Sequence, residues 1–210
     1  MRPQVLLAEV SDGSESLAWM REQGWGRMIC FRPFTPYLHE KWGFDNGAFD
    51  SWQNGNPWDE FAYLERLERA RRFDCDPLVA VVPDIVAGGC ESLEFSMKWL
   101  YRLPHDWPWY LAVQDGMEPK DVEQVLHMFS GVFLGGTDKF KTQAYRWAKL
   151  AHGAGKKFHY GRCGTIRKLR HAVRVGADSL DSSYPLWTKR RREWFRAVHA
   201  SDPQMEMVHA

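Results

Sequence analysis

Short apolar segments rich in β-branched residues recur along the chain, and polar segments of helical length separate most of them. The apolar segments have the length of buried strands, and the polar segments have the length of surface helices. The predicted strands are residues 5–10, 28–32, 42–45, 78–83, 109–114, 132–135, 158–161 and 179–182. The clearest predicted helices are residues 57–72, 91–101, 118–128, 142–152, 165–175 and 186–199.

This alternation of strand and helix determines the expected fold class. Repeated βα units predict a parallel sheet that is covered by helices. Eight such units have the closed (β/α)8 barrel, the TIM barrel, as their simplest arrangement, with an open doubly wound sheet as the alternative. We expect a single barrel over residues 1–200 and a loosely ordered tail over residues 201–210.

Start signals support several of the helices. Pro57 follows Asn56 and suits a first helical turn, Pro119 suits the first turn after Glu118, and Thr165 is a candidate N-cap. The boundaries that these residues suggest can be compared directly with the structure.

Size and composition narrow the class of protein. A chain of 210 residues with 44% hydrophobic and 26% charged residues suits one globular domain and excludes a disordered chain. No apolar run approaches the roughly 20 residues that span a bilayer, so we expect a cytoplasmic protein without a membrane partner. The four cysteines contain no CxxC pair, which predicts reduced thiols and no zinc subdomain.

Charge is distributed unevenly along the chain. Residues 1–137 carry 12 Lys and Arg against 21 Asp and Glu, whereas residues 138–197 carry 16 against 4. The basic clusters are Lys156–Lys157, Arg167 with Lys168 and Arg170, and residues 189–192. They suit contact with nucleic-acid phosphates, and a solvated helix face is the alternative.

Polar residues lie at the C-terminal ends of six of the predicted strands. They are Asp45-Asn46-Gly47, Asp84, Gln114-Asp115-Gly116, Gly135-Gly136, His159 to Arg162, and Asp181-Ser182-Ser183. Barrel enzymes build their active sites at these strand ends, although a single Asp there is often only a cap or turn former. A metal barrel would offer several histidines, and here only His159 stands at a strand end, so we expect acid, base and nucleophile roles and no metal or cofactor.

Several of these segments, in order, resemble one family. Residues 44–49 read Phe-Asp-Asn-Gly-Ala-Phe, residues 113–116 read Val-Gln-Asp-Gly, and residues 134–136 read Leu-Gly-Gly. Gly161-Arg162 is followed by Gly-Ala-Asp-Ser-Leu-Asp-Ser at residues 176–182. This pattern resembles the tRNA-guanine transglycosylase superfamily, and most closely its small members that insert 7-deazaguanines into DNA.

The resemblance implies a role for each matched residue. Asp181 would be the nucleophile that attacks C1′ of the sugar, and Asp45 the general acid and base. Asp84 would accept hydrogen bonds from N1 and N2 of guanine. Gln114 and the Gly136 amide would donate hydrogen bonds to O6. The remaining substrate-binding candidates are Asn46, Phe49, Gly135 and Tyr160, and the nucleic-acid-binding candidates are Arg162, Lys189, Arg190 and Arg191.

Aromatic side chains near the strand ends have two interpretations. Phe49, Trp52 and Tyr160 could stack on a base extracted from nucleic acid. They could equally pack the barrel.

The chain also departs from the family pattern. It lacks the Cys/His zinc cluster of the tRNA enzymes, and Asn46 and Ala48 replace a family Ser and Gly. We therefore expect DNA, rather than tRNA, and a free 7-deazaguanine base as partners, with a homodimer as a further expectation. The alternatives are the same exchange on tRNA, an N-glycosidase that hydrolyses the intermediate, and a non-catalytic nucleic-acid-binding subunit.

Overall fold

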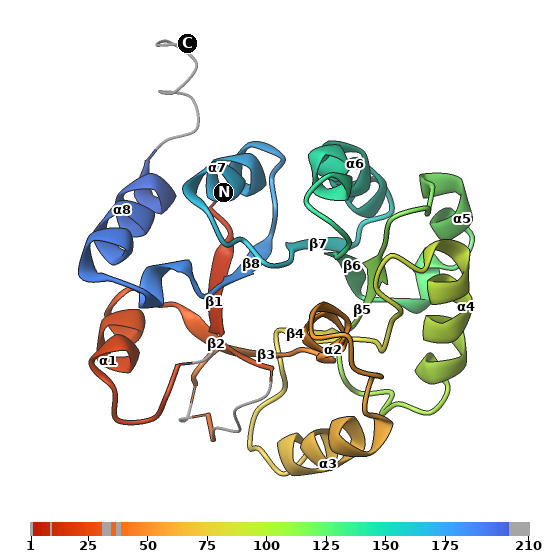
Figure 1. Ribbon diagram of the computed structural model, residues 1–210, viewed down its shortest axis with the longest axis horizontal. Helices are drawn as coiled ribbons and strands as arrows, with labels where there is room; N and C mark the ends of the chain where they lie inside the picture. The colour runs from red at the N-terminus through yellow and green to blue at the C-terminus, as the bar shows by residue number, and fades with distance from the viewer. Residues whose placement is uncertain (1, 9, 31–34, 37–38, 202–210) are drawn as a thin grey trace.

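Eight parallel strands form a closed barrel in the order of the sequence, surrounded by helices (Figure 1). The computed structural model describes residues 2–8, 10–30, 35–36 and 39–201. The strands are β1 Gln4–Ala8, β2 Gly26–Ile29, β3 Trp42–Phe44, β4 Val79–Val81, β5 Trp109–Val113, β6 Gly131–Leu134, β7 Lys157–Tyr160 and β8 Ser179–Ser182. Each pairs with the next, and β8 closes the barrel against β1, from Gln4 opposite Ser179 to Leu7 opposite Ser182. The (β/α)8 prediction is confirmed.

The helices of the described residues are α1 Glu15–Glu22, α2 Ala48–Gln53, α3 Glu60–Ala70, α4 Gly89–Leu100, α5 Pro119–Glu123, α6 Ala144–Gly153, α7 Ile166–Arg174 and α8 Lys189–Ala200. Short 3₁₀ turns at Leu126–Met128, Phe140–Gln143 and Tyr184–Leu186 complete the connections. Across the described residues, none of these helices is both long enough and apolar enough to cross a bilayer.

Alternation along the strands separates two apolar layers. Side chains such as Leu6, Met28 and Val79 fill the barrel interior, while a larger core lies between the strands and the helices. The interior is tight at Gly43, where an added Cβ would lie 2.6 Å from Met28 Sδ. Glycine therefore lets β3 approach its neighbours closely enough to close the barrel.

The predicted element boundaries needed a few corrections. Pro57 is not in a helix, because α3 begins at Glu60 and Asp59 caps it by accepting from the Ala62 amide at 2.9 Å. The single helix predicted over residues 118–128 is α5 followed by a 3₁₀ turn. Thr165 is an N-cap as predicted and accepts from Lys168 N at 3.2 Å. The end of the predicted strand 28–32 and the predicted tail, beyond residue 201, fall outside the described residues.

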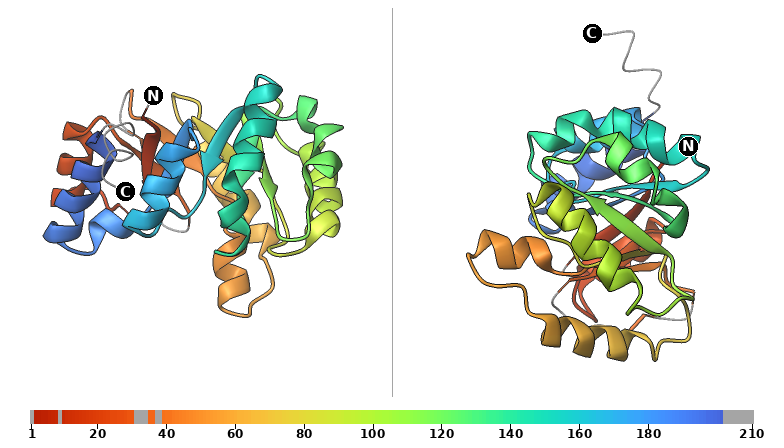
Figure 2. Two further views of the ribbon diagram at one scale, coloured as in Figure 1. Left: turned by 90° about the horizontal axis from the view of Figure 1, so that it is seen from above. Right: turned by 90° about the vertical axis from the view of Figure 1, so that its right-hand side faces the viewer.

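The clearest predicted helices did not include α1 and α2. The shorter of the two, α2, follows β3 directly and lies over the barrel opening in Figure 1, and the right-hand view of Figure 2 shows it projecting from the barrel. Its N-cap, Gly47, has a left-handed φ of 77°, a conformation that glycine adopts without strain. This sharp turn places Asp45, before the bend, and Phe49, after it, at the barrel mouth.

Candidate active site at the carboxyl ends of the strands

Carboxylates from distant parts of the sequence, among them Asp45, Asp84 and Asp181, border two adjoining cavities at the barrel mouth. The first, the Asp84 cavity, has a volume of about 30 Å³ and is lined by Asp45, Asp84 and Gln114 among others. The second, the Asp181 cavity, has a volume of about 250 Å³ and is lined by Asp181 and again by Asp45. Asp45 therefore faces both cavities, between the other two carboxylates.

Asp84 lies at the bottom of its cavity in a network of amides. Asn46 Nδ2 donates to Asp84 Oδ1 at 2.5 Å, and Gln114 Nε2 donates to Asp84 Oδ2. The far side of each amide is also held: Asn46 Oδ1 accepts from the Ala48 amide at 2.8 Å, and Gln114 Oε1 accepts from the Ala87 amide at 3.2 Å. These bonds fix which amide atoms face Asp84.

Burial raises the pKa of Asp84 to about 7, and the charge of Asp45 adds to this increase. The hydrogen bonds from Asn46 and Gln114 act in the opposite direction and lower the pKa. Burial also raises the pKa of Asp45 to about 6, and the neighbouring Asp181 carboxylate adds to the increase. A carboxyl group with a pKa near 6 can both give and take a proton close to neutral pH, which is the property that a general acid and base requires.

Asp181 is held by donors from two directions. His159 Nε2 lies 3.0 Å from Asp181 Oδ1, and the Arg162 backbone N–H donates to both carboxylate oxygens at 3.0 and 3.1 Å. His159 Nδ1 lies 2.8 Å from the Ser179 hydroxyl, and its ring stacks on Phe133 with centroids 4.8 Å apart. In the neutral imidazole, Nε2–H donates to Asp181 while Nδ1 accepts from Ser179.

Sequence reasoning missed this role of His159 and did not propose Ser179 as a site residue. The signal was present in the strand period, since Ser179 and Asp181 are two residues apart and so share one face of β8. The barrel register then pairs His159 with Ser179. Knowing the register in advance would have identified the support for Asp181.

Arg162 separates the two cavities. Its guanidinium lies 3.4 Å from the centroid of the Phe49 ring and donates to the Gly136 carbonyl. Its φ of 51° is left-handed, a conformation that costs a non-glycine residue about 1–3 kcal/mol. The strained turn aims the backbone N–H at Asp181 while the side chain stacks on Phe49, and both residues line both cavities.

The glycine pair after β6 completes the wall of the Asp84 cavity. A Cβ at Gly135 would lie 2.5 Å from Gln114 Nε2, and one at Gly136 would lie 2.6 Å from Asp115 Oδ2. Asp115 itself accepts from the Thr137 amide at 2.7 Å and from the Thr137 hydroxyl at 2.6 Å. Asp115 is thus a turn former, whereas the two glycines leave space at the cavity wall.

Other predicted site residues lie elsewhere. Tyr160 is buried outside the barrel, with its hydroxyl 3.4 Å from His171 Nδ1, because it alternates with the inward-facing His159. Lys189, Arg190 and Arg191 begin α8 and line neither cavity. Lys189 pairs with Glu15 at 3.6 Å, and Arg191 lies 4.5 Å from the ring of Trp187.

The fold and the mouth define the class of protein as a (β/α)8 barrel with a carboxylate-lined site at its usual position. A scan against protein-family models finds no match, and a search of curated proteins finds none. Among the described residues, no three His, Cys, Asp or Glu side chains are arranged to hold a metal ion.

Proposed function

We propose that this protein is a guanine transglycosylase that exchanges guanine in DNA for a free 7-deazaguanine base. The observation that carries the proposal is the placement of Asp45 between Asp84 and Asp181, facing both cavities. A glycosidic bond joins a base to a sugar, so its enzyme needs one group for each part and a proton donor at the junction.

In the first step, an Asp181 oxygen attacks C1′ of the target nucleotide as the bond from C1′ to N9 breaks, and Asp45 gives its proton to the departing guanine. The product is a glycosyl ester on Asp181. In the second step, Asp45 takes a proton from the incoming base, whose N9 attacks C1′ and releases Asp181. The donors from His159 and Arg162 hold the Asp181 carboxylate in position for both attacks.

Base identity follows from the donors and acceptors around Asp84. The carboxylate would accept from N1 and the exocyclic N2 of guanine, which adenine cannot supply in the same arrangement. Gln114 Nε2 directs one hydrogen to Asp84, and its second hydrogen would serve O6 together with the Gly136 amide. Both bases in the exchange carry this same edge, so one pocket serves the departing and the incoming base.

The Asp84 cavity at about 30 Å³ holds a water or two and no purine. Base binding therefore requires Arg162 to leave the face of Phe49, where the base would then stack. The freed guanidinium would turn to a phosphate of the same strand, replacing one cation–π contact by a charge-assisted hydrogen bond.

The test is to incubate the protein with DNA, and separately with tRNA, in the presence of labelled guanine or a 7-deazaguanine, and to analyse the digested nucleosides by mass spectrometry. We expect incorporation into DNA, and loss of incorporation by on the order of 10³-fold or more in Asp181→Asn. The matched control is Asp76→Asn, an exposed carboxylate outside both cavities.

Three outcomes would contradict the proposal. Undiminished exchange by Asp181→Asn would exclude the nucleophile. Release of guanine without incorporation would identify a hydrolase. Incorporation into tRNA alone would exclude DNA as the substrate.

A further inference from the structure

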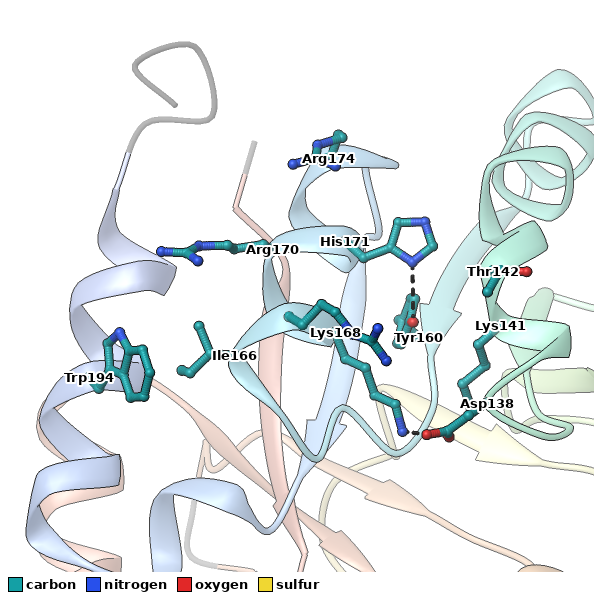
Figure 3. A pocket seen from close by; sticks show the side chains of 11 residues that line it. Asp138, Lys141, Thr142, Tyr160, Ile166, Lys168, Arg170, His171, Arg174 and Trp194 are labelled. Atoms are coloured by element: carbon teal, nitrogen blue, oxygen red, sulfur yellow. Dashed lines mark hydrogen bonds and ion pairs between the residues drawn. The ribbon is translucent and has the colours of Figure 1, made fainter. Parts of the chain in front are cut away.

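A cavity with a basic lining lies outside the barrel. It has a volume of about 580 Å³ and is lined by parts of α7, α8 and the segment before α6 (Figure 3). We name it the α7 groove, after the helix that supplies Arg167, Lys168, Arg170, His171 and Arg174. None of its lining residues borders the Asp84 or Asp181 cavity.

The charge on α7 is costly for the isolated helix. Arg167, Arg170 and Arg174 follow one another at spacings of three and four residues, which places them along one helix face. Like charges at these spacings destabilise a helix, and α7 contains no acidic residue. Among the described residues neither Arg167 nor Arg174 forms an ion pair. A bound polyanion would offset this repulsion.

The one acidic side chain among the described residues lining the groove is already engaged. Asp138 Oδ1 accepts from Lys168 Nζ at 2.6 Å, and this bond is the main reason why the pKa of Asp138 is below its usual value. Figure 3 shows this pair at one end of the groove and Arg174 at the other. Arg167 and Arg174 therefore face no competing carboxylate among the described residues that line the groove.

The groove also offers an aromatic surface. Trp194 on α8 is 50% exposed, and its ring lies beside Ile166 and below Arg170 in Figure 3. Tyr160, buried below, holds His171 by its hydroxyl at 3.4 Å. A cationic wall beside an exposed indole is the combination that binds a nucleic-acid strand, because phosphates contact the cations and a base stacks on the ring.

The cations are distributed along the helix instead of converging on one point. Arg167 and Arg174 are seven residues apart, a rise of about 10 Å along the axis, so they reach different phosphates. A site for a single terminal phosphate would gather its donors around one anion. The spacing therefore favours a polynucleotide over a mononucleotide.

The groove starts next to the barrel mouth. Asp138 is two residues after Gly136, and Ile166 is four residues after Arg162. A strand whose target nucleotide enters the mouth therefore meets the groove within a short distance.

We infer that the α7 groove binds the phosphodiester backbone of the DNA substrate next to the exchanged nucleotide, with a base stacked on Trp194. The identity of the polymer rests on the proposed function. The lining of the groove and its charge do not depend on the proposed function.

The test measures binding of a fluorescein-labelled mixed-sequence DNA oligonucleotide by anisotropy between about 50 and 200 mM salt. The variant Arg167→Gln/Arg170→Gln/Arg174→Gln should lower the slope of log affinity against log salt by about 2 to 3, since each phosphate contact contributes about 0.7 to 0.9. Removal of like charges should leave the helix at least as stable, which circular dichroism checks. The matched control, Arg69→Gln/Lys98→Gln/Lys120→Gln, removes the same charge from exposed positions on α3, α4 and α5 and should keep the parent slope.

A second variant tests the stacking surface. Trp194→Ala should weaken single-stranded DNA binding about tenfold without changing the salt slope, while Tyr101→Ala removes a 69% exposed ring elsewhere and should have no effect.

Equal slopes for the two triple variants would overturn the inference, and so would tighter binding of guanosine monophosphate than of DNA in the groove. Asp181→Asn should bind DNA like the parent protein. If Asp181→Asn binds DNA but does not exchange the base, binding and chemistry are separable. A failure of the groove would then appear in the binding assay, and a failure of the proposed chemistry in the exchange assay.

Discussion

The barrel mouth and the α7 groove differ in the burial and in the prevailing charge of their ionisable side chains. The mouth gathers buried carboxylates whose pKa values are raised to about 6 for Asp45 and about 7 for Asp84, chiefly by burial. The groove carries exposed cations along a helix surface. Burial gives a site control of proton transfer, whereas exposure lets a site release counterions when a polyanion binds. The two regions therefore suit different parts of one task, and variants of each should fail in different assays.

Apart from loss of Asp181 itself, the largest effect in this comparison is expected at Asp84 in the mouth. Asp84→Asn keeps the shape of the side chain but presents an N–H₂ group in place of an acceptor, so a donor would face the N–H groups of guanine. Sites built on such hydrogen bonds reject mismatched partners strongly, and we expect exchange to fall on the order of 10²-fold or more. Steady-state kinetics of the exchange with free guanine measures this fall in rate. A variant that exchanges at the parent rate would show that Asp84 does not read the base.

The support of Asp181 should contribute less. His159→Phe keeps the stack on Phe133 but removes the donor to the carboxylate. Loss of a hydrogen bond to a charged group costs about 1.5–3 kcal/mol, equivalent to about ten- to hundredfold in kcat. Ser179→Ala, which leaves the imidazole in place, should have a smaller effect, and DNA affinity should be unchanged in both. A change in KM alone would contradict a positioning role.

Arg162 lies between the regions, because its side chain lines the Asp84 cavity and its position in the chain adjoins the groove. Arg162→Ala should bind free guanine several-fold more tightly, since the cation no longer covers Phe49. The same variant should exchange base in DNA about tenfold more slowly, because it loses a phosphate contact. Calorimetry measures the affinity for free guanine, and kinetics with DNA measures the rate of exchange. Weaker binding of free guanine would indicate that the guanidinium holds the base and does not exclude it.

The most general effect is on stability. The pKa values of Asp45 and Asp84 are higher in the folded protein than their usual value of 3.8, so between about pH 4 and pH 7 the folded state binds more protons than the unfolded state. The free energy of unfolding should therefore fall as pH rises through this window, by on the order of a few kcal/mol. Urea unfolding at about pH 5 and pH 8 measures the fall. The double variant Asp45→Asn/Asp84→Asn should lose most of it, and a parent protein that is more stable at the higher pH would contradict the assignment.

The sequence by itself determined the barrel and the location of its candidate site. Alternating apolar and polar segments specify strands and helices because each strand must bury both faces and each helix one. The polar residues that end β3, β4 and β8 must then meet at one edge. Asp45, Asp84 and Asp181 could be identified in this way without knowledge of their contacts.

Only the tertiary structure decided which neighbours each of these residues has. Tyr160 and His159 are adjacent in the chain, yet one faces the helices and the other supports Asp181, because consecutive strand residues point to opposite sides. The strand period alone does not say which side is inward; closure of the barrel does. The stack of Arg162 on Phe49 and the α7 groove likewise depend on side chains from separate βα units, whose distances are set by packing and are not encoded in local sequence.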